Sequence, residues 1–224
     1  MSKTLRFARL DFITIKPYLT WKNLLLLLGI ALVMQFGGGG SPASISMIMA
    51  FGFTYISYPF AVGEKNGIDA LYATLPITRK TVVAGRYVFS LILNILVAAI
   101  GVLTILVFSV VFKAEFAAIE ILMVTLVSIV IFGVIQAMQL PIYFKLGYAK
   151  AKFAAFLPFG LVPLLVLILS RLSTQMDFGA LFSAAVAWIS NNLGIFGIWC
   201  ALIWAVGIVL SYFVSVRFYL KREF

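Results

Sequence analysis

Long apolar runs without charged residues constrain this chain more than any other feature of its sequence. Hydrophobic residues make up 64% of the 224 residues, and only 11% are charged. A helix needs about 20 predominantly apolar residues to cross the hydrocarbon core of a bilayer. Runs near that length occur at residues 23–37, 45–62, 81–112, 119–144, 153–170 and 193–216. The sequence therefore predicts an all-α membrane protein with six transmembrane helices, built as one domain over residues 1–224.

The residue types that are absent exclude most enzymes. The chain has no histidine, which removes histidine-containing triads, haem ligation by histidine and zinc sites built on histidine pairs. Its single cysteine, Cys200, lies in an apolar run and has no partner for a disulfide within the chain. A glycine-rich phosphate loop ending in Lys-Ser or Lys-Thr is also missing. The sequence predicts no catalytic residue, no metal site and no cofactor on this chain.

The basic residues predict the topology. Of the 17 lysines and arginines, only Lys113 and Arg171 fall on the side of the predicted membrane opposite both termini. Cytoplasmic loops carry an excess of Lys and Arg, so we expect both termini to be cytoplasmic. The net charge of +10 is then explained by topology and by attraction to anionic lipids of the bilayer. These charges are dispersed over short segments, which argues against a nucleic-acid partner.

Residues 1–22 form a basic leader before the first predicted span. Leu5, Phe7, Leu10 and Phe12 alternate there with Arg6 and other cations, a mixture typical of an amphipathic helix on the membrane surface. Pro17 then turns the chain toward the membrane. The alternative is a frayed basic tail.

Few polar residues interrupt the predicted spans. No ionisable residue lies mid-span, which disfavours an ion-coupled carrier. The notable intramembrane polar residues are Asn94, Gln136 and Gln139. They are candidates for the lining of a substrate path, and the alternative is that they form hydrogen bonds between helices.

The cytoplasmic segment at residues 63–80 has the pattern of a short helix. Asn66 is a suitable N-cap with Asp69 in the first turn, and Pro76 would end the helix. One apolar stripe is formed by Ile68, Leu71, Tyr72 and Leu75. A helix this short is only marginally stable by itself in water. It therefore needs to pack against a membrane surface or into a groove of a cytoplasmic partner.

The same segment resembles a motif of a known protein family. Glu64-x-x-Gly67, followed by Leu71-x-x-x-Leu75-Pro76-Ile77-x-Arg79-Lys80 and a long span, resembles the ABC-2 type permeases, the membrane subunits of ATP-binding-cassette exporters. The resemblance implies that this segment is a coupling helix between the second and third spans, seated in a cleft of the ATPase. The residues it implicates are Glu64, Gly67, Ile68, Asp69, Leu71, Tyr72, Leu75, Pro76 and Arg79.

The outer segment at residues 171–192 strengthens the resemblance. Phe178, Leu181, Phe182, Ala185 and Trp188 fall on one helical face, which predicts an interfacial outer helix. A similar extracellular helix precedes the last span of ABC-2 permeases.

The resemblance implies an exporter subunit in a bacterial-type plasma membrane. Its partners would be two copies of an ATPase subunit, which bind the ATP and Mg, and a second permease copy that completes a homodimer or a heterodimer with a sister permease. The size and layout most resemble exporters of amphipathic peptides such as phenol-soluble modulins, and bacitracin-resistance permeases. The alternatives are an antibiotic or lipid exporter of the same family, and a membrane scaffold or immunity protein that works without an ATPase.

Overall fold

A computed structural model describes residues 3–68, 72, 77–113, 118–154, 157, 160, 164, 168, 184, 187–189 and 191–222. Every regular element among them is helical. The elements are α1 (Lys3–Ile15), η1 (Lys16–Tyr18), α2 (Trp21–Met34), η2 (Gln35–Gly39), α3 (Gly40–Phe53), η3 (Thr54–Ser57), α4 (Tyr58–Lys65), α6 (Arg79–Phe112), α7 (Ala118–Leu146), α8 (Tyr148–Ala154) and α11 (Leu193–Leu220).

The described part contains 4 helical segments that are long and apolar enough to cross a membrane. They are Trp21–Lys65, Arg79–Phe112, Ala118–Leu146 and Leu193–Leu220. The last three include the predicted spans at 81–112, 119–144 and 193–216. Most of the predicted fifth span and most of the outer segment lie outside the described residues. The structure thus agrees with a helical membrane protein, while the count of six spans stays a prediction.

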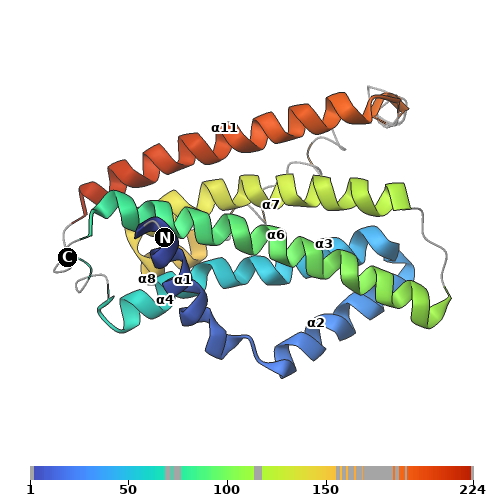
Figure 1. The fold of residues 1–224 in the computed structure, drawn as a ribbon, viewed down its shortest axis with the longest axis horizontal. Helices are drawn as coiled ribbons and strands as arrows, with labels where there is room; N and C mark the ends of the chain where they lie inside the picture. Colours follow the sequence, from blue (N-terminus) through green and yellow to red (C-terminus); the bar gives the residue numbers. More distant parts are fainter. Residues whose placement is uncertain are drawn as a thin grey trace.

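The first segment, Trp21–Lys65, contains both of the first two predicted spans. The chain reverses direction within it at a run of glycines, so that α2 and α3 lie side by side (Figure 1). Gly38 has a φ of 99° and Gly40 a φ of 63°, values that residues with a Cβ rarely adopt. The Ser44 hydroxyl lies 2.9 Å from the Ala31 carbonyl and 3.1 Å from the Gly40 carbonyl, which closes the turn.

The long helix α6 organises the bundle. It contacts α1, α3, α7 and α11, and Figure 1 shows it running the length of the molecule between α7 and α2. Small residues allow the close approach of helices in a membrane, where no hydrophobic force drives them together. Gly52 of α3 faces the Val97 side chain, and Gly133 of α7 faces the Trp204 ring of α11, so closely that a Cβ at either glycine would clash.

The leader forms the helix α1, and one face of it packs on the bundle. Phe7, Ala8, Asp11 and Ile15 are buried there. A Cβ at Gly85 of α6 would lie 2.6 Å from the Phe7 ring, so the two helices touch at this point. The buried face of α1 therefore packs on α6, while its opposite face, with Leu5, Leu10 and Ile13, is exposed. The placement of that exposed face on the membrane surface stays a prediction.

Candidate functional site

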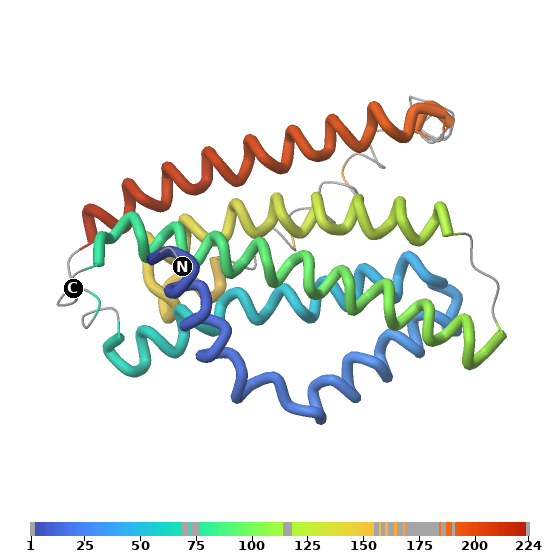
Figure 2. The backbone as a smooth tube through the Cα atoms, viewed as in Figure 1, coloured from blue at the N-terminus to red at the C-terminus, as the bar shows by residue number. Residues whose placement is uncertain are grey.

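The candidate site is the end of the bundle where α4 and α11 finish and α6 begins (Figure 2). This end carries residues 63–80, the segment that the sequence predicts to couple the protein to an ATPase. Its described residues are 63–68, 72 and 77–80. Asp69, Leu71, Leu75 and Pro76 lie outside the described residues, so their predicted contacts stay predictions.

Glu64 binds the start of another helix. Its carboxylate accepts hydrogen bonds from the backbone N–H of Tyr148 and, at 3.1 Å, from that of Ala149. These are the first residues of α8. Free N–H groups at a helix start favour a carboxylate through hydrogen bonding and through the helix dipole. Glu64 therefore joins the end of α4 to the start of α8.

Gly147 makes this junction possible. It has a φ of 75° and separates α7 from α8, and its N–H donates to the Tyr143 carbonyl at 3.0 Å. A Cβ at this position would lie 2.8 Å from an Arg222 guanidinium nitrogen and 3.0 Å from the Glu64 carboxylate. Glu64 and Arg222, which are distant in sequence, therefore both lie next to Gly147.

Arg79 fixes the C-terminal end of the segment at residues 63–80. Its guanidinium donates to the carbonyls of Tyr219, Leu220 and Arg222 at 3.2, 2.9 and 3.0 Å. These carbonyls lie at and just beyond the end of α11, where backbone acceptors lack helical partners and the dipole favours a cation. Arg79 thus joins the start of α6 to the end of α11.

The interior of the segment contacts the leader helix. The Tyr72 ring packs edge-on against Phe7 of α1, with ring centroids 5.0 Å apart. Phe7 in turn touches Gly85 of α6. Ile68 is half-buried, and Gly67 has a left-handed φ of 64°. Tyr72 is therefore engaged within the chain, and Phe7 of α1 contacts both Tyr72 and α6.

One capping assignment was wrong. The sequence suggested that Asn66 begins the coupling helix, whereas the structure places it at the end of α4, where its N–H donates to the Val62 carbonyl at 3.1 Å. Asn is favourable in turns at either end of a helix, because its side chain tolerates the conformations found there. The local pattern could not distinguish the two ends.

We expect Glu64→Gln and Arg79→Met each to lower the free energy of unfolding by about 1–2 kcal/mol, since each substitution removes charge-assisted hydrogen bonds at a helix end. Lys65→Met and Lys80→Met are matched controls, because both lysines are exposed neighbours. Thermal unfolding of the purified protein in detergent measures the difference. Equal stability of the four variants would contradict the helix-end role.

The three predicted path residues are buried in the bundle. Asn94 of α6 donates from its amide to the Ile129 carbonyl of α7 at 3.2 Å, which is the helix–helix hydrogen bond of the alternative interpretation. Gln136 is fully buried, and its amide atoms have no hydrogen-bond partner among the described residues. Gln139 is also buried. Cavities of about 500 and 320 Å³ are lined by other residues.

Sequence reasoning missed a buried ion pair. Arg86 of α6 and Asp11 of α1 are each only 2% exposed, and Arg86 Nε lies 3.8 Å from an Asp11 carboxylate oxygen. The guanidinium also lies over the Phe60 ring of α4, 4.0 Å from its centroid. From its place in the chain, Arg86 is expected among the cytoplasmic cations. The sequence does contain one indication of this ion pair. Asp11 is an acidic residue on the same helical face as Phe7 and Ile15, four residues from each.

A polar junction between three helices was also missed. The Tyr87 hydroxyl of α6 lies 2.5 Å from Ser211 Oγ and 2.8 Å from Ser215 Oγ of α11. Ser211 Oγ donates to the Ala137 carbonyl of α7 at 2.5 Å. Hydrogen bonds of this kind hold helices together in a membrane. The serines are four residues apart, a spacing that places them on one face of α11.

The fold and this site define a multi-pass helical membrane protein in which the segment at residues 63–80 is tied to the ends of neighbouring helices. The family model described as ABC-2 family transporter protein matches residues 8–220, and the chain belongs to that family. No curated protein matches the sequence. The chain is therefore a membrane permease subunit of an ABC transporter, a family that associates with an ABC ATPase subunit.

Proposed function

We propose that this permease exports an amphipathic peptide or a similar amphiphile across a bacterial plasma membrane. ATP and Mg are bound by two copies of a separate ATPase subunit. A second permease copy, identical or a sister chain, completes the complex. The phenol-soluble-modulin and bacitracin-resistance permeases, which the sequence resembles, are the models for this arrangement.

The observation that carries the proposal is the fixing of both flanks of the segment at residues 63–80. Glu64 binds the start of α8, and Arg79 binds the end of α11. An ATPase that moves this segment therefore pulls on α4, α8 and α11 together. Leu71, Asp69, Leu75 and Pro76 are proposed as direct ATPase contacts, with Ile68 and Gly67 at the segment's start. Tyr72 passes the displacement to α1.

The chemistry of the bundle interior supports an amphiphilic cargo. The buried Arg86 lies close to Asp11, so the pair presents little net charge to a passing ion. Asn94, Gln136 and Gln139 are proposed to contact the cargo when the helices separate. Gln136 carries most of this argument, because its buried amide has no hydrogen-bond partner within the described part of the chain. Such a group is costly unless another state of the protein satisfies it.

The topology that export requires predicts that Lys65, Arg79, Lys150 and Arg217 face the cytoplasm. Each is replaced singly by cysteine on a background in which Cys200 is changed to Ala. A membrane-impermeant maleimide added to intact cells should label none of them, and should label all four after the membrane is opened. Labelling of any one in intact cells would contradict the proposed orientation.

Cargo recognition is tested with the permease and its co-purifying ATPase reconstituted in vesicles. We expect an amphipathic helical peptide to stimulate ATP hydrolysis, while a scrambled peptide of the same composition does not. Gln136→Met should reduce the stimulation at least about threefold, the loss of roughly one hydrogen bond. Met138→Leu, on an exposed position of the same helix, is the control. Stimulation only by a lipid or a small drug would show that the cargo class is wrong.

A further inference from the structure

A cavity of about 500 Å³ lies at the elbow formed by η1 between α1 and α2. We call it the elbow cavity. Its apolar walls come from α1, α2, α3 and α6, and they include Phe12, Ile15, Leu27, Ile48, Leu93 and Val97. A volume of this size falls in the range of sites for small ligands, about 300–1,000 Å³. The cavity is separate from the segment at residues 63–80.

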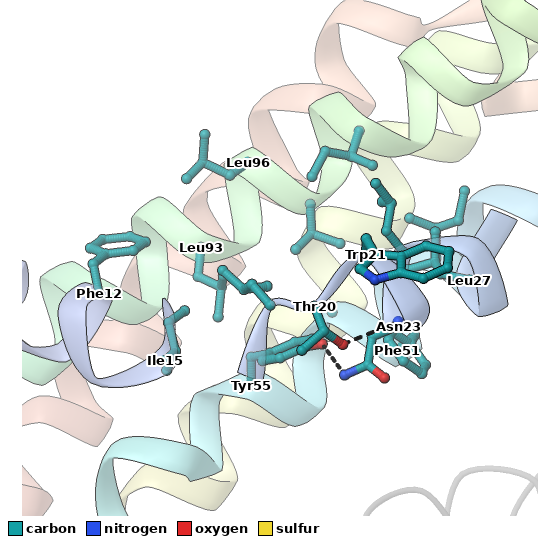
Figure 3. A pocket seen from close by; sticks show the side chains of 16 residues that line it. Phe12, Ile15, Thr20, Trp21, Asn23, Leu27, Phe51, Tyr55, Leu93 and Leu96 are labelled. Carbon is teal, nitrogen blue, oxygen red and sulfur yellow. Dashed lines mark hydrogen bonds between the residues drawn. The ribbon is translucent and has the colours of Figure 1, made fainter. Parts of the chain in front are cut away.

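The polar groups of the elbow cavity are gathered on one side. Figure 3 shows Thr20, Asn23 and Tyr55 close together, with Phe12 and Leu96 on the other side. The Asn23 amide lies 3.5 Å from the Tyr55 hydroxyl, and the Asn23 N–H donates to the Thr20 hydroxyl oxygen at 3.4 Å. The cavity therefore has an apolar body and one polar edge, which matches a ligand with a long apolar chain and a polar head.

Two lysines are sequence neighbours of residues that line the cavity. Lys16 follows the lining residue Ile15, and Lys22 lies between the lining residues Trp21 and Asn23. Both lysines are exposed, and the ion pair found in the described part of the chain involves neither of them. Trp21 is 68% exposed, as suits a residue at the membrane–water interface. Exposed cations this close in sequence to the lining residues favour an anionic head group.

The elbow cavity is open to the surroundings of the bundle. Two lining residues, Leu24 of α2 and Leu96 of α6, are 51% and 47% exposed. Both belong to segments apolar enough to cross a membrane. A ligand that enters past these leucines comes from the lipid phase, and it reaches the polar edge without leaving the membrane interface.

We propose that the elbow cavity binds one anionic phospholipid, with an acyl chain against Leu93, Val97 and Leu27 and its phosphate against Lys16 and Lys22. The Thr20 hydroxyl is placed to donate to an ester oxygen of the same lipid. An amphipathic peptide fits less well. A helix is about 10 Å across, so it needs a wide groove along its whole length. A single acyl chain is much narrower.

The test uses the full-length protein in vesicles of phosphatidylcholine that contain a trace of photoreactive phosphatidylglycerol, with the reactive group on the acyl chain. The comparison probe is phosphatidylcholine with the same acyl chain. We expect cross-links to peptides from the cavity wall, and at least about threefold more from the anionic probe, since each lysine near a membrane attracts anionic lipid. Equal cross-linking by the two probes would overturn the proposal.

Two sets of variants separate the site from the general lipid boundary. Leu96→Trp fills the cavity and should reduce cross-linking at least about threefold, whereas Leu103→Trp, two turns along the same exposed stripe of α6, should not. Lys16→Gln combined with Lys22→Gln should bring the anionic probe down to the level of the neutral one, and Lys150→Gln should not. An unchanged signal in Leu96→Trp would overturn the proposal. So would displacement of both probes alike by an amphipathic peptide, which would assign the cavity to the cargo.

Discussion

Replacing Asp11 by leucine should lower the free energy of unfolding by about 3–5 kcal/mol, because it leaves the buried Arg86 guanidinium without its carboxylate partner. The two side chains are almost completely buried between α1 and α6, and Arg86 Nε lies 3.8 Å from the carboxylate. Water cannot compensate for the lost charge at that depth. Chemical denaturation of the protein in detergent micelles, followed by tryptophan fluorescence, measures the change.

A double variant gives a stricter test of the interaction between Asp11 and Arg86. Asp11→Leu combined with Arg86→Met removes both charges and keeps similar side-chain volume, so it should recover most of the lost stability. Arg9→Leu on the exposed face of α1 is the control and should change stability by less than about 0.5 kcal/mol. A double variant as unstable as Asp11→Leu alone would mean that the pair does not act as a unit.

The second large effect is expected at the ATPase contact. Leu71→Asp should weaken binding of the ATPase that co-purifies with the wild-type chain by about thirtyfold or more, since a buried anchor residue in an interface is worth about 2 kcal/mol. Peptide-stimulated ATP hydrolysis should fall with it. The permease should still insert and fold, because the change lies outside the helical segments that are apolar enough to cross a membrane.

Ala73→Asp is the matched control for Leu71→Asp. It adds the same charge two residues along, about 200° around the predicted helix and therefore on the face opposite the apolar stripe. We expect it to bind the ATPase as the wild type does. If Leu71→Asp co-purifies with the ATPase at unchanged yield and transport persists, the assignment of this segment as the coupling helix fails. Loss of binding in both variants would point to a general effect of charge instead.

Much of the helical framework could be predicted because its signals are local. Runs of apolar residues near the length of a membrane crossing predicted the positions that α6, α7 and α11 occupy. The glycine run at residues 37–40 lies at the boundary between the first two predicted spans, and the chain reverses there (Figure 1). The match to the ABC-2 family agrees with a resemblance carried by one short cytoplasmic motif.

The partners of the site residues could not be predicted, because they are distant in sequence. Glu64 was singled out from its motif, yet its hydrogen-bond partner Ala149 lies 85 residues away. Arg79 binds a carbonyl 141 residues away. Asn94 was offered as a path residue, and its amide binds a carbonyl of α7 in this structure. No pattern within one helix reports which carbonyl of another helix lies opposite.

The sequence by itself determined that this chain forms apolar helices and holds a short motif similar to that of ABC-2 permeases, and it predicts that the cations lie mainly on one side of the membrane. These properties follow from hydropathy, charge and spacing within single segments. Only the tertiary structure decided that Glu64 and Arg79 tie the segment at residues 63–80 to α8 and α11, that Asp11 meets Arg86, and that an apolar cavity opens beneath the elbow. The physical reason is that hydrogen bonds, ion pairs and cavities depend on the relative placement of helices, which close packing at small residues such as Gly85 and Gly133 sets.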